Sequence, residues 1–220
     1  MSDAFDTRYD DLPAEIPIFP LPRVILLPRT QLPLNIFEPR YLAMTRAALS
    51  THRLIGMIQP QDEKGAGVLC TTGCVGRIVS FSETDDGRYL ITLKGVARFD
   101  LAAAPVQNPM GYLQARVDWS PYKQDLEPDT VTDICRESMV QTLHAYFKQM
   151  GMSCDQWEQI RQIGCERLVG TLSVVCPFAA AEKQALLEAP TLADRARLLR
   201  GLLESAVRSG CSGECPDTRH

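Results

Sequence analysis

The 220-residue chain carries 45% hydrophobic and 23% charged residues, which is the composition of an ordinary soluble globular protein with one large core or two small ones. Its net charge of −4 provides no electrostatic attraction to nucleic acid or anionic lipid, because neutralising phosphates requires clustered Lys and Arg. No stretch approaches the ~18 apolar residues of a membrane helix, and the acidic N-terminus lacks the pattern of a targeting peptide. We therefore expect a cytoplasmic protein with reduced cysteines and no membrane contact.

The chain begins with a polar, acidic segment, residues 1–14, which predicts a disordered tail. Short apolar runs broken by proline follow at residues 16–19 and 24–27, and they are typical of strands. Proline cannot donate to a β-ladder, so we expect these runs at the edges or bulges of a sheet. The prolines that interrupt them are Pro17, Pro20, Pro22 and Pro28.

The most distinctive stretch, residues 32–41, joins an apolar strand directly to a helix. Pro39 suits the first helical position, because the N–H that proline lacks would have no partner there. Glu38 then occupies the N-cap, near the positive end of the helix dipole. Apolar and small residues spaced i, i+3, i+4 and i+7 from Tyr41 predict an amphipathic helix.

Glu38 and Arg40 have two interpretations. If they are exposed, local pairing contributes no more than about 0–1 kcal/mol. If they are buried at the joint, removing one partner costs roughly 3–5 kcal/mol, because the other charge is left without a partner. We favour burial, since Phe37 and Tyr41 are expected to lie against the core, and we predict Arg98 as the partner of Glu38.

A β-hairpin is predicted around Thr84–Gly87, because Asp-Gly between two β-rich runs supplies the positive φ angles of a tight turn. Gly95 is expected to break or bulge the second arm. Further strands are predicted at residues 54–58, 68–70 and 112–119. Many short strands with one inserted helix favour a small curled sheet or barrel over residues 15–119.

The pattern becomes helical after a charged, Pro-containing connector at residues 120–129. Short loops between helices imply packed antiparallel neighbours, so residues 120–208 are predicted to form a bundle. Residues 209–220, rich in Gly, Ser and Pro, predict a disordered tail. The expected helices span residues 131–151, 153–163, 166–176, 180–188 and 191–207.

Several stretches together resemble the LON substrate-binding, or Lon N-terminal, domain family across about residues 14–205. They are residues 16–21, 32–41, 73–78, 86–89, 95–99 and 182–188. The resemblance implies an α+β fold: a PUA-like β-barrel with one inserted helix, followed by a helical bundle. The residues that match the family motifs, expected to be mostly structural, are Pro33, Phe37, Glu38, Pro39, Arg40, Tyr41, Gly87, Arg98 and Phe99.

In full-length Lon proteases this module precedes an ATPase and a protease domain and helps to recognise substrates. The chain is too short to hold either domain, and its sequence lacks the G-x-x-x-x-G-K-[ST] motif that cradles phosphates. The resemblance therefore implies a stand-alone, non-enzymatic recognition module, which we expect to need no cofactor.

Catalytic and metal sites are not predicted. His52, His144 and His220 are scattered, and no G-x-S-x-G motif marks a serine nucleophile. Cys211 and Cys215 have zinc-like spacing with His220, but a closed structural site needs about four ligands and this tail offers three. We expect free thiols there, and packed thiols at Cys70 and Cys74.

The densest basic cluster is Arg195, Arg197 and Arg200, near the C-terminus. We interpret it as a solvated helix face. No aromatic residue interleaves with these arginines, although single-stranded RNA is usually recognised by stacking on aromatic rings. Nucleic acid is therefore the less favoured partner.

The sequence leads to three functional hypotheses. The first is a protein that binds unfolded or peptide segments of other proteins, either at sheet edges left open by Pro17, Pro20 and Pro28 or in the cleft between barrel and bundle. The second is an RNA-binding PUA-like module, and the third is an uncharacterised hydrolase. The groove residues and the oligomeric state are left open.

Overall fold

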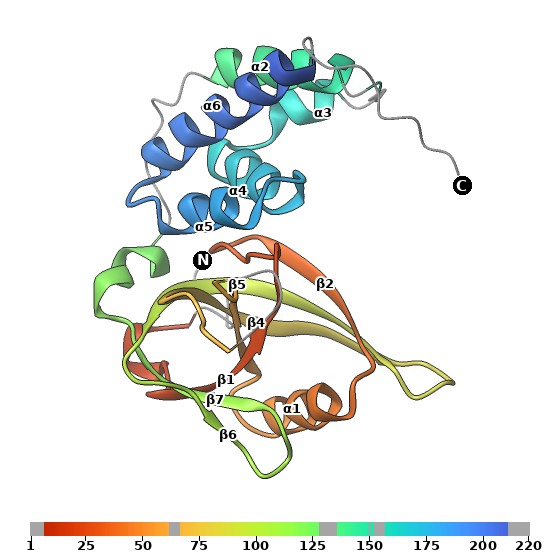
Figure 1. The fold of residues 1–220 in the computed structure, drawn as a ribbon, viewed down its shortest axis with the longest axis vertical. Coiled ribbons are helices and arrows are strands. Elements are labelled where there is room, and N and C mark those ends of the chain that lie inside the picture. The colour runs from red at the N-terminus through yellow and green to blue at the C-terminus, as the bar shows by residue number, and fades with distance from the viewer. Residues whose placement is uncertain (1–6, 62–66, 128–135, 150, 152–156, 211–220) are drawn as a thin grey trace.

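A computed structural model describes residues 7–61, 67–127, 136–149, 151 and 157–210. All the strands form one mixed sheet, and a layer of helices lies on one side of it (Figure 1). The α+β class is thereby confirmed. The strands are β1 (Glu15–Pro20), β2 (Gln31–Ile36), β3 (Leu54–Ile58), β4 (Thr72–Glu83), β5 (Tyr89–Leu101), β6 (Val106–Gln107) and β7 (Leu113–Asp118).

The sheet closes on itself. Its strand order is β2-β5-β4-β3-β1-β7-β6, and β5 also pairs with β7, through Asp100 opposite Asp118 and Leu101 opposite Val117. Five strands, β5, β4, β3, β1 and β7, therefore form a ring, while β2 and β6 extend it on the outside. Phe99 fills the interior, and a Cβ on Gly73 would lie 2.4 Å from its ring. Glycine is therefore required where β4 passes this ring.

The expectation that the proline-rich runs lie at sheet edges is wrong for β1. This strand pairs with β7 over Glu15–Ile18 and with β3 over Ile18–Pro20. Each neighbour uses only about half of the strand, so Pro17 lies outside the β3 ladder and Pro20 outside the β7 ladder. A missing N–H costs no ladder hydrogen bond at such positions. Residues 24–27 form no strand, and three of them are buried in the core.

The joint between β2 and α1 (Pro39–Leu49) forms as predicted, with Glu38 at the N-cap and Tyr41 buried. Its charges, however, are not buried. Arg40 and Glu38 pair at 2.9 Å with about half of each side chain exposed, and Phe37 is 62% exposed. The strand alternation turns Ile36 inward and Phe37 outward, while the buried face of α1 begins at Tyr41. The predicted burial of Glu38, Arg40 and Phe37 is therefore wrong.

The predicted hairpin is present, with Gly87 at φ 79° in its turn. Beyond it β5 runs unbroken past Gly95, where the register with β4 shifts between Val75 and Gly76. Gly95 therefore lies at a bulge rather than at a break. A bulge of this kind bends its strand locally.

The helical layer begins with the 3-10 helix η2 (Ser120–Leu126), and α5 is the helix that lies next to the barrel in Figure 1. Thr191 caps α6: the Asp194 N–H donates to Thr191 Oγ1 at 3.1 Å. Parts of the first two expected helices lie outside the described residues. The helices are α2 (Arg136–Gln149), α3 (Trp157–Gln162), α4 (Cys165–Val175), α5 (Ala180–Glu188) and α6 (Leu192–Gly210).

Residues 7–14, expected in a disordered tail, pack on the barrel instead. They contain a short 3-10 helix, η1 (Tyr9–Asp11), and the Pro13 carbonyl accepts a hydrogen bond from Trp119 Nε1 at 3.0 Å. Lys123 of η2 lies 4.4 Å from the centre of the Tyr9 ring. Within the described residues, no helix has the length and apolar character needed to cross a membrane.

A pocket between barrel and helical layer

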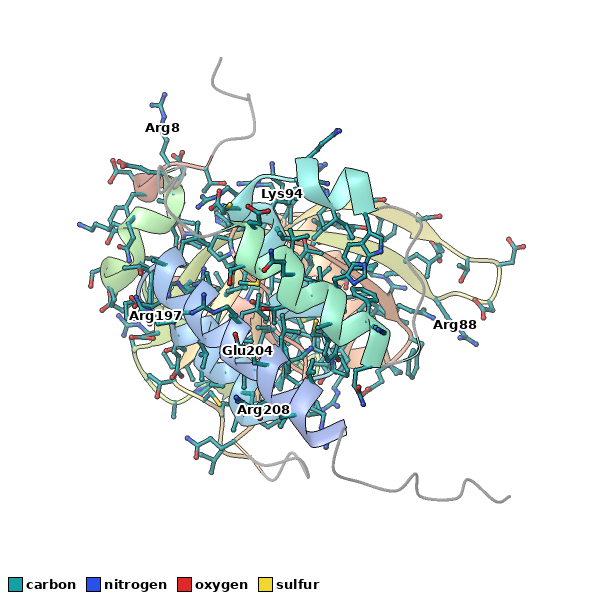
Figure 2. The ribbon with its side chains drawn as sticks, turned by 90° about the horizontal axis from the view of Figure 1, so that it is seen from above. Arg8, Arg88, Lys94, Arg197, Glu204 and Arg208 are labelled. Atoms are coloured by element: carbon teal, nitrogen blue, oxygen red, sulfur yellow. The ribbon has the colours of Figure 1, made fainter. Side chains whose placement is uncertain are left out.

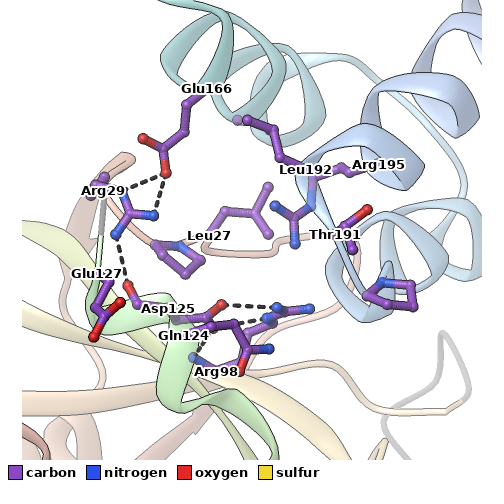
Figure 3. A pocket seen from close by; sticks show the side chains of 13 residues that line it. Leu27, Arg29, Arg98, Gln124, Asp125, Glu127, Glu166, Thr191, Leu192 and Arg195 are labelled. Atoms are coloured by element: carbon purple, nitrogen blue, oxygen red, sulfur yellow. Dashed lines mark hydrogen bonds and ion pairs between the residues drawn. The ribbon is translucent and has the colours of Figure 1, made fainter. Parts of the chain in front are cut away.

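A pocket of about 270 Å³ lies where the barrel meets the helical layer (Figure 3). Five segments line it: the turn before β2, β5 through Arg98, η2 with the residue that follows it, α4, and the start of α6. Its rim is exposed at Gln124, Glu127, Pro190 and Thr191. Its interior is lined by the buried side chains of Leu27, Arg98, Asp125, Leu192 and Arg195.

Arg98 connects the barrel to the helical layer at the base of this pocket. Its guanidinium forms a bidentate pair with Asp125 of η2, with both N–O distances at 2.8 Å, and only 2% of the side chain is exposed. A third nitrogen, Nη1, donates to the carbonyls of Leu187 and Ala189 at 3.2 and 2.8 Å. The prediction that Glu38 is the ion-pair partner of Arg98 is therefore wrong. Arg98 instead joins β5, η2 and the end of α5.

The electrostatics of Arg98 follow from this geometry. Burial alone lowers the pKa of Arg98, but the hydrogen bonds and negative charge of Asp125 outweigh burial, so the pKa lies above its usual value. The Tyr122 ring lies 4.6 Å from the guanidinium carbon and adds a cation–π contact. Arg98 is therefore a fixed cation whose charge is already matched.

Arg195 is the second buried cation, and its interpretation as part of a solvated face is wrong. It is 8% exposed, and its Nε donates to the Leu186 carbonyl at 2.8 Å. Arg195 follows Leu192 by three positions, which places it on the buried stripe of α6. Burial and the neighbouring charge of Arg98 lower the pKa of Arg195 to about 10, although Asp125 partly opposes this shift.

Of the other two arginines of the predicted basic cluster, Arg197 is exposed, and Arg200 is half-buried and donates to Ser138 Oγ of α2 at 3.3 Å. Arg197 pairs with Asp194 at 3.0 Å, and Arg200 lies 3.6 Å from Glu204. Figure 2, viewed from the helical side, shows Arg197 and Glu204 along the outward surface of α6. These two arginines are therefore separated from the pocket and are matched by acidic neighbours.

Arg29 forms the wall of the pocket nearest α4. Its guanidinium pairs with Glu166, and its Nη1 donates to the Asp125 carbonyl at 2.7 Å. Its backbone has φ 64°, in the left-handed region, and its N–H donates to the Gly95 carbonyl at 2.8 Å. A Cβ on Gly95 would lie 2.0 Å from the Leu27 carbonyl oxygen. The turn that presents Arg29 therefore depends on the bulge in β5.

The predicted motif residues are spread over the molecule, and only Arg98 lines the pocket. Phe99 fills the barrel, Gly87 lies in the hairpin turn, and Pro33 is on the outer strand β2 opposite Thr92. The family-matching residues from Phe37 to Tyr41 lie at the β2–α1 joint. Their structural role remains a prediction.

Arg29 and Asp125 were not singled out by the sequence. Arg29 lies in the turn before β2 and Asp125 in the short 3-10 helix η2, where the sequence carries no periodic pattern that predicts burial. The i+3 spacing from Leu192 does predict a buried Arg195.

The pocket combines apolar walls with two ion-paired arginines, Arg98 and Arg29, and with Arg195, which bonds to backbone carbonyls. The described histidines, His52 and His144, are exposed outside it, and the His144 ring lies against Trp157 with ring centres 4.6 Å apart. Among the described residues, no three His, Cys, Asp or Glu side chains form a group that could hold a metal ion. Cys211, Cys215 and His220 lie outside that part of the chain.

The family model of the ATP-dependent protease La (LON) substrate-binding domain matches residues 15–205 of this chain. The chain belongs to this family. Its members are substrate-recognition modules, and the match includes both the barrel and the helical layer.

Among curated relatives, the chain is 29% identical to a Lon protease of Anaeromyxobacter dehalogenans over 113 residues, which is 50% of the chain and 13% of that protein. It is 26% identical to Lon protease 2 of Sorangium cellulosum over 198 residues, covering 86% of the chain and 24% of that protein. With the Escherichia coli K12 Lon protease it shares 23% identity over 203 residues, or 88% of the chain and 25% of that protein. The chain thus spans a quarter or less of these relatives.

Two solved structures share the fold of this LON-family chain. The Lon N-terminal domain protein from Xanthomonas campestris aligns with a TM-score of 0.60 at 24% identity, covering 86% of this chain and 97% of that one. The N-terminal domain of the Mycobacterium avium complex Lon protease aligns with a TM-score of 0.63 at 18% identity, covering 86% and 98%. At these identities the likeness supports the fold alone.

Proposed function

We propose that this chain is a non-enzymatic module that binds unfolded or peptide segments of other proteins in the pocket between barrel and helical layer. The observation that carries the proposal is the pocket itself, which combines an exposed rim with a buried interior in a family of substrate-binding domains. Its walls join apolar surface at Leu27 and Leu192 to fixed charges. Binding sites typically combine apolar surface with a few polar groups in this way.

The pocket is a better candidate than the sheet edges. β1, which carries Pro17 and Pro20, is paired on both sides, so a peptide strand cannot add to it. β2 pairs only with β5 among the described strands, but Pro33 in its middle cannot donate a hydrogen bond to an added strand. Strand addition is therefore disfavoured at both places.

The test measures binding to a permanently unfolded protein. Reduced and carboxamidomethylated α-lactalbumin carries a fluorescent label, and its anisotropy is followed as the chain is added. We expect micromolar affinity, about −8 kcal/mol, and only a weak dependence on salt, because Arg98 and Arg29 are already ion-paired and few charges are left for a ligand to neutralise. Native α-lactalbumin is the matched control and should not bind. Equal binding of both forms would contradict the proposal.

The same titration with labelled single-stranded RNA tests the alternative. Binding through several phosphates weakens steeply as salt rises. Tight, salt-sensitive RNA binding together with no binding of the unfolded protein would replace the proposal with the RNA-binding hypothesis.

A further inference from the structure

The three guanidiniums of the pocket are not matched equally. Arg98 has Asp125 and Arg29 has Glu166, each in a direct ion pair. The hydrogen bonds of Arg195 within the described residues go to two backbone carbonyls, those of Leu186 and Ala189, at 2.8 and 3.4 Å. Arg195 is therefore a cation with more than nine-tenths of its surface buried and with no carboxylate of the described residues bonded to it.

The position of Arg195 makes its charge available to a ligand. Figure 3 shows its guanidinium turned toward the pocket, between Leu27 and Thr191. Glu127, also lining the pocket, is on the exposed rim, where solvent screens its charge. Burial and the charge of Arg98 lower the pKa of Arg195 more than the charges of Asp125 and Glu166 raise it, so a further anion placed beside the guanidinium would relieve an unfavourable environment.

The charges also limit the kind of anion. One unmatched cation balances one negative charge, whereas a phosphate group near neutral pH carries nearly two. Arginine pairs with a carboxylate through two parallel hydrogen bonds, a geometry suited to its planar fork. Leu27, Pro28 and Leu192 add apolar wall beside the guanidinium. A carboxylate attached to a small apolar group fits these features.

We propose that the pocket binds a single carboxylate of a protein segment, contacted by Arg195, with an apolar neighbour of that carboxylate against Leu27 and Leu192. The carboxylate comes either from the C-terminus of a chain or from an Asp or Glu side chain. This inference rests on the proposed function and specifies which protein segments the pocket prefers.

The test compares three short probes with the whole chain at constant ionic strength. They are acetyl-Gly-Leu with a free carboxylate, its C-terminal amide, and acetyl-Gly-Asp-Leu-amide. Binding is followed in ¹⁵N–¹H spectra at the Nε–H of Arg195 and the backbone amides of residues 191–196. We expect the acid to bind at least tenfold more tightly than the amide and to shift the Arg195 signal. The third probe shows whether a side-chain carboxylate suffices.

Two variants locate the contact. Arg195→Gln should remove the preference for the acid, whereas Arg197→Gln, a surface arginine on the same helix, should keep it. Folding of each variant is checked by thermal melting. If Arg195→Gln does not fold, the acid and amide titrations of the unaltered chain still decide the question.

The inference is overturned if the acid and the amide bind equally, if neither binds, or if the acid shifts signals outside the pocket. If the unfolded protein nevertheless binds the unaltered chain with the expected affinity, the carboxylate inference fails and the proposed function stands. Loss of unfolded-protein binding as well would mean that the proposed function itself has failed.

Discussion

At the scale of single residues, the main finding is that a buried ion pair joins the barrel to the helices. The sequence indicated that Arg98 belongs to a structural motif, and the structure buries it. Its partner could not be predicted, because Asp125 lies in a connector with no periodic pattern, and pairing across 27 positions depends on how the chain folds back. The charges at the β2–α1 joint are exposed instead.

Removing the carboxylate of Asp125 tests the strength of this pair. Asp125→Ala leaves the Arg98 guanidinium buried without its charge partner, so we expect the free energy of unfolding to fall by about 3–5 kcal/mol. Urea unfolding followed by circular dichroism measures the change. Glu38→Ala, which breaks the exposed pair with Arg40, should cost no more than about 1 kcal/mol. Equal losses in the two variants would refute this assignment of the buried pair.

The Cys176 thiol gives a prediction about alkaline pH. Burial raises the pKa of Cys176 from 9.0 to about 11. Between these values the unfolded chain loses the thiol proton while the folded chain keeps it, so the free energy of unfolding falls as pH rises. Two pKa units correspond to a loss of about 2–3 kcal/mol. Urea unfolding at pH 9 and pH 11 should show a smaller fall in the free energy of unfolding for Cys176→Ala than for the unaltered chain. An equal fall in the two proteins would contradict the raised pKa of Cys176.

At the scale of elements, periodic and turn patterns in the sequence predicted the helices and hairpins whose formation depends on neighbouring residues. The helix Ala180–Glu188 and the hairpin around Gly87 form as expected, since periodicity, capping residues and turn residues act over a few positions. Residues 24–27 look like a strand but form none. Their apolar side chains belong to a core formed by helices and strands that are distant in sequence. A local sequence pattern cannot predict such contacts.

The bulge at Gly95 links element geometry to the pocket. Gly95→Ala would place a Cβ 2.0 Å from the Leu27 carbonyl oxygen, so the turn carrying Arg29 must move. We expect a loss of about 3 kcal/mol in the free energy of unfolding and weaker binding of the unfolded protein. Gly201→Ala is the matched control. No atom lies within 4 Å of its added Cβ, and alanine favours helix, so it should stabilise the protein by up to about 1 kcal/mol.

At the scale of the whole molecule, the sequence predicted a sheet followed by helices but not how they meet. Closure of the ring depends on β5 pairing with β7, and the pocket depends on five segments spread over residues 27–195. Such contacts join positions far apart in the chain, so spacing alone cannot reveal them. The predicted cleft between barrel and bundle has its structural counterpart in this pocket, while the docking role remains a proposal.

The most direct test of that role blocks the pocket without disturbing its interior. Gln124 lies exposed on the rim, and its side chain hydrogen-bonds only to the Pro121 carbonyl among the described groups. Gln124→Trp should fill the mouth of the pocket, and Gln107→Trp on β6, at the far side of the barrel in Figure 1, is the matched control. We expect the affinity for unfolded α-lactalbumin to fall at least tenfold in the first variant and to stay unchanged in the second. Unchanged affinity in a folded Gln124→Trp protein would show that binding occurs elsewhere and would contradict the account.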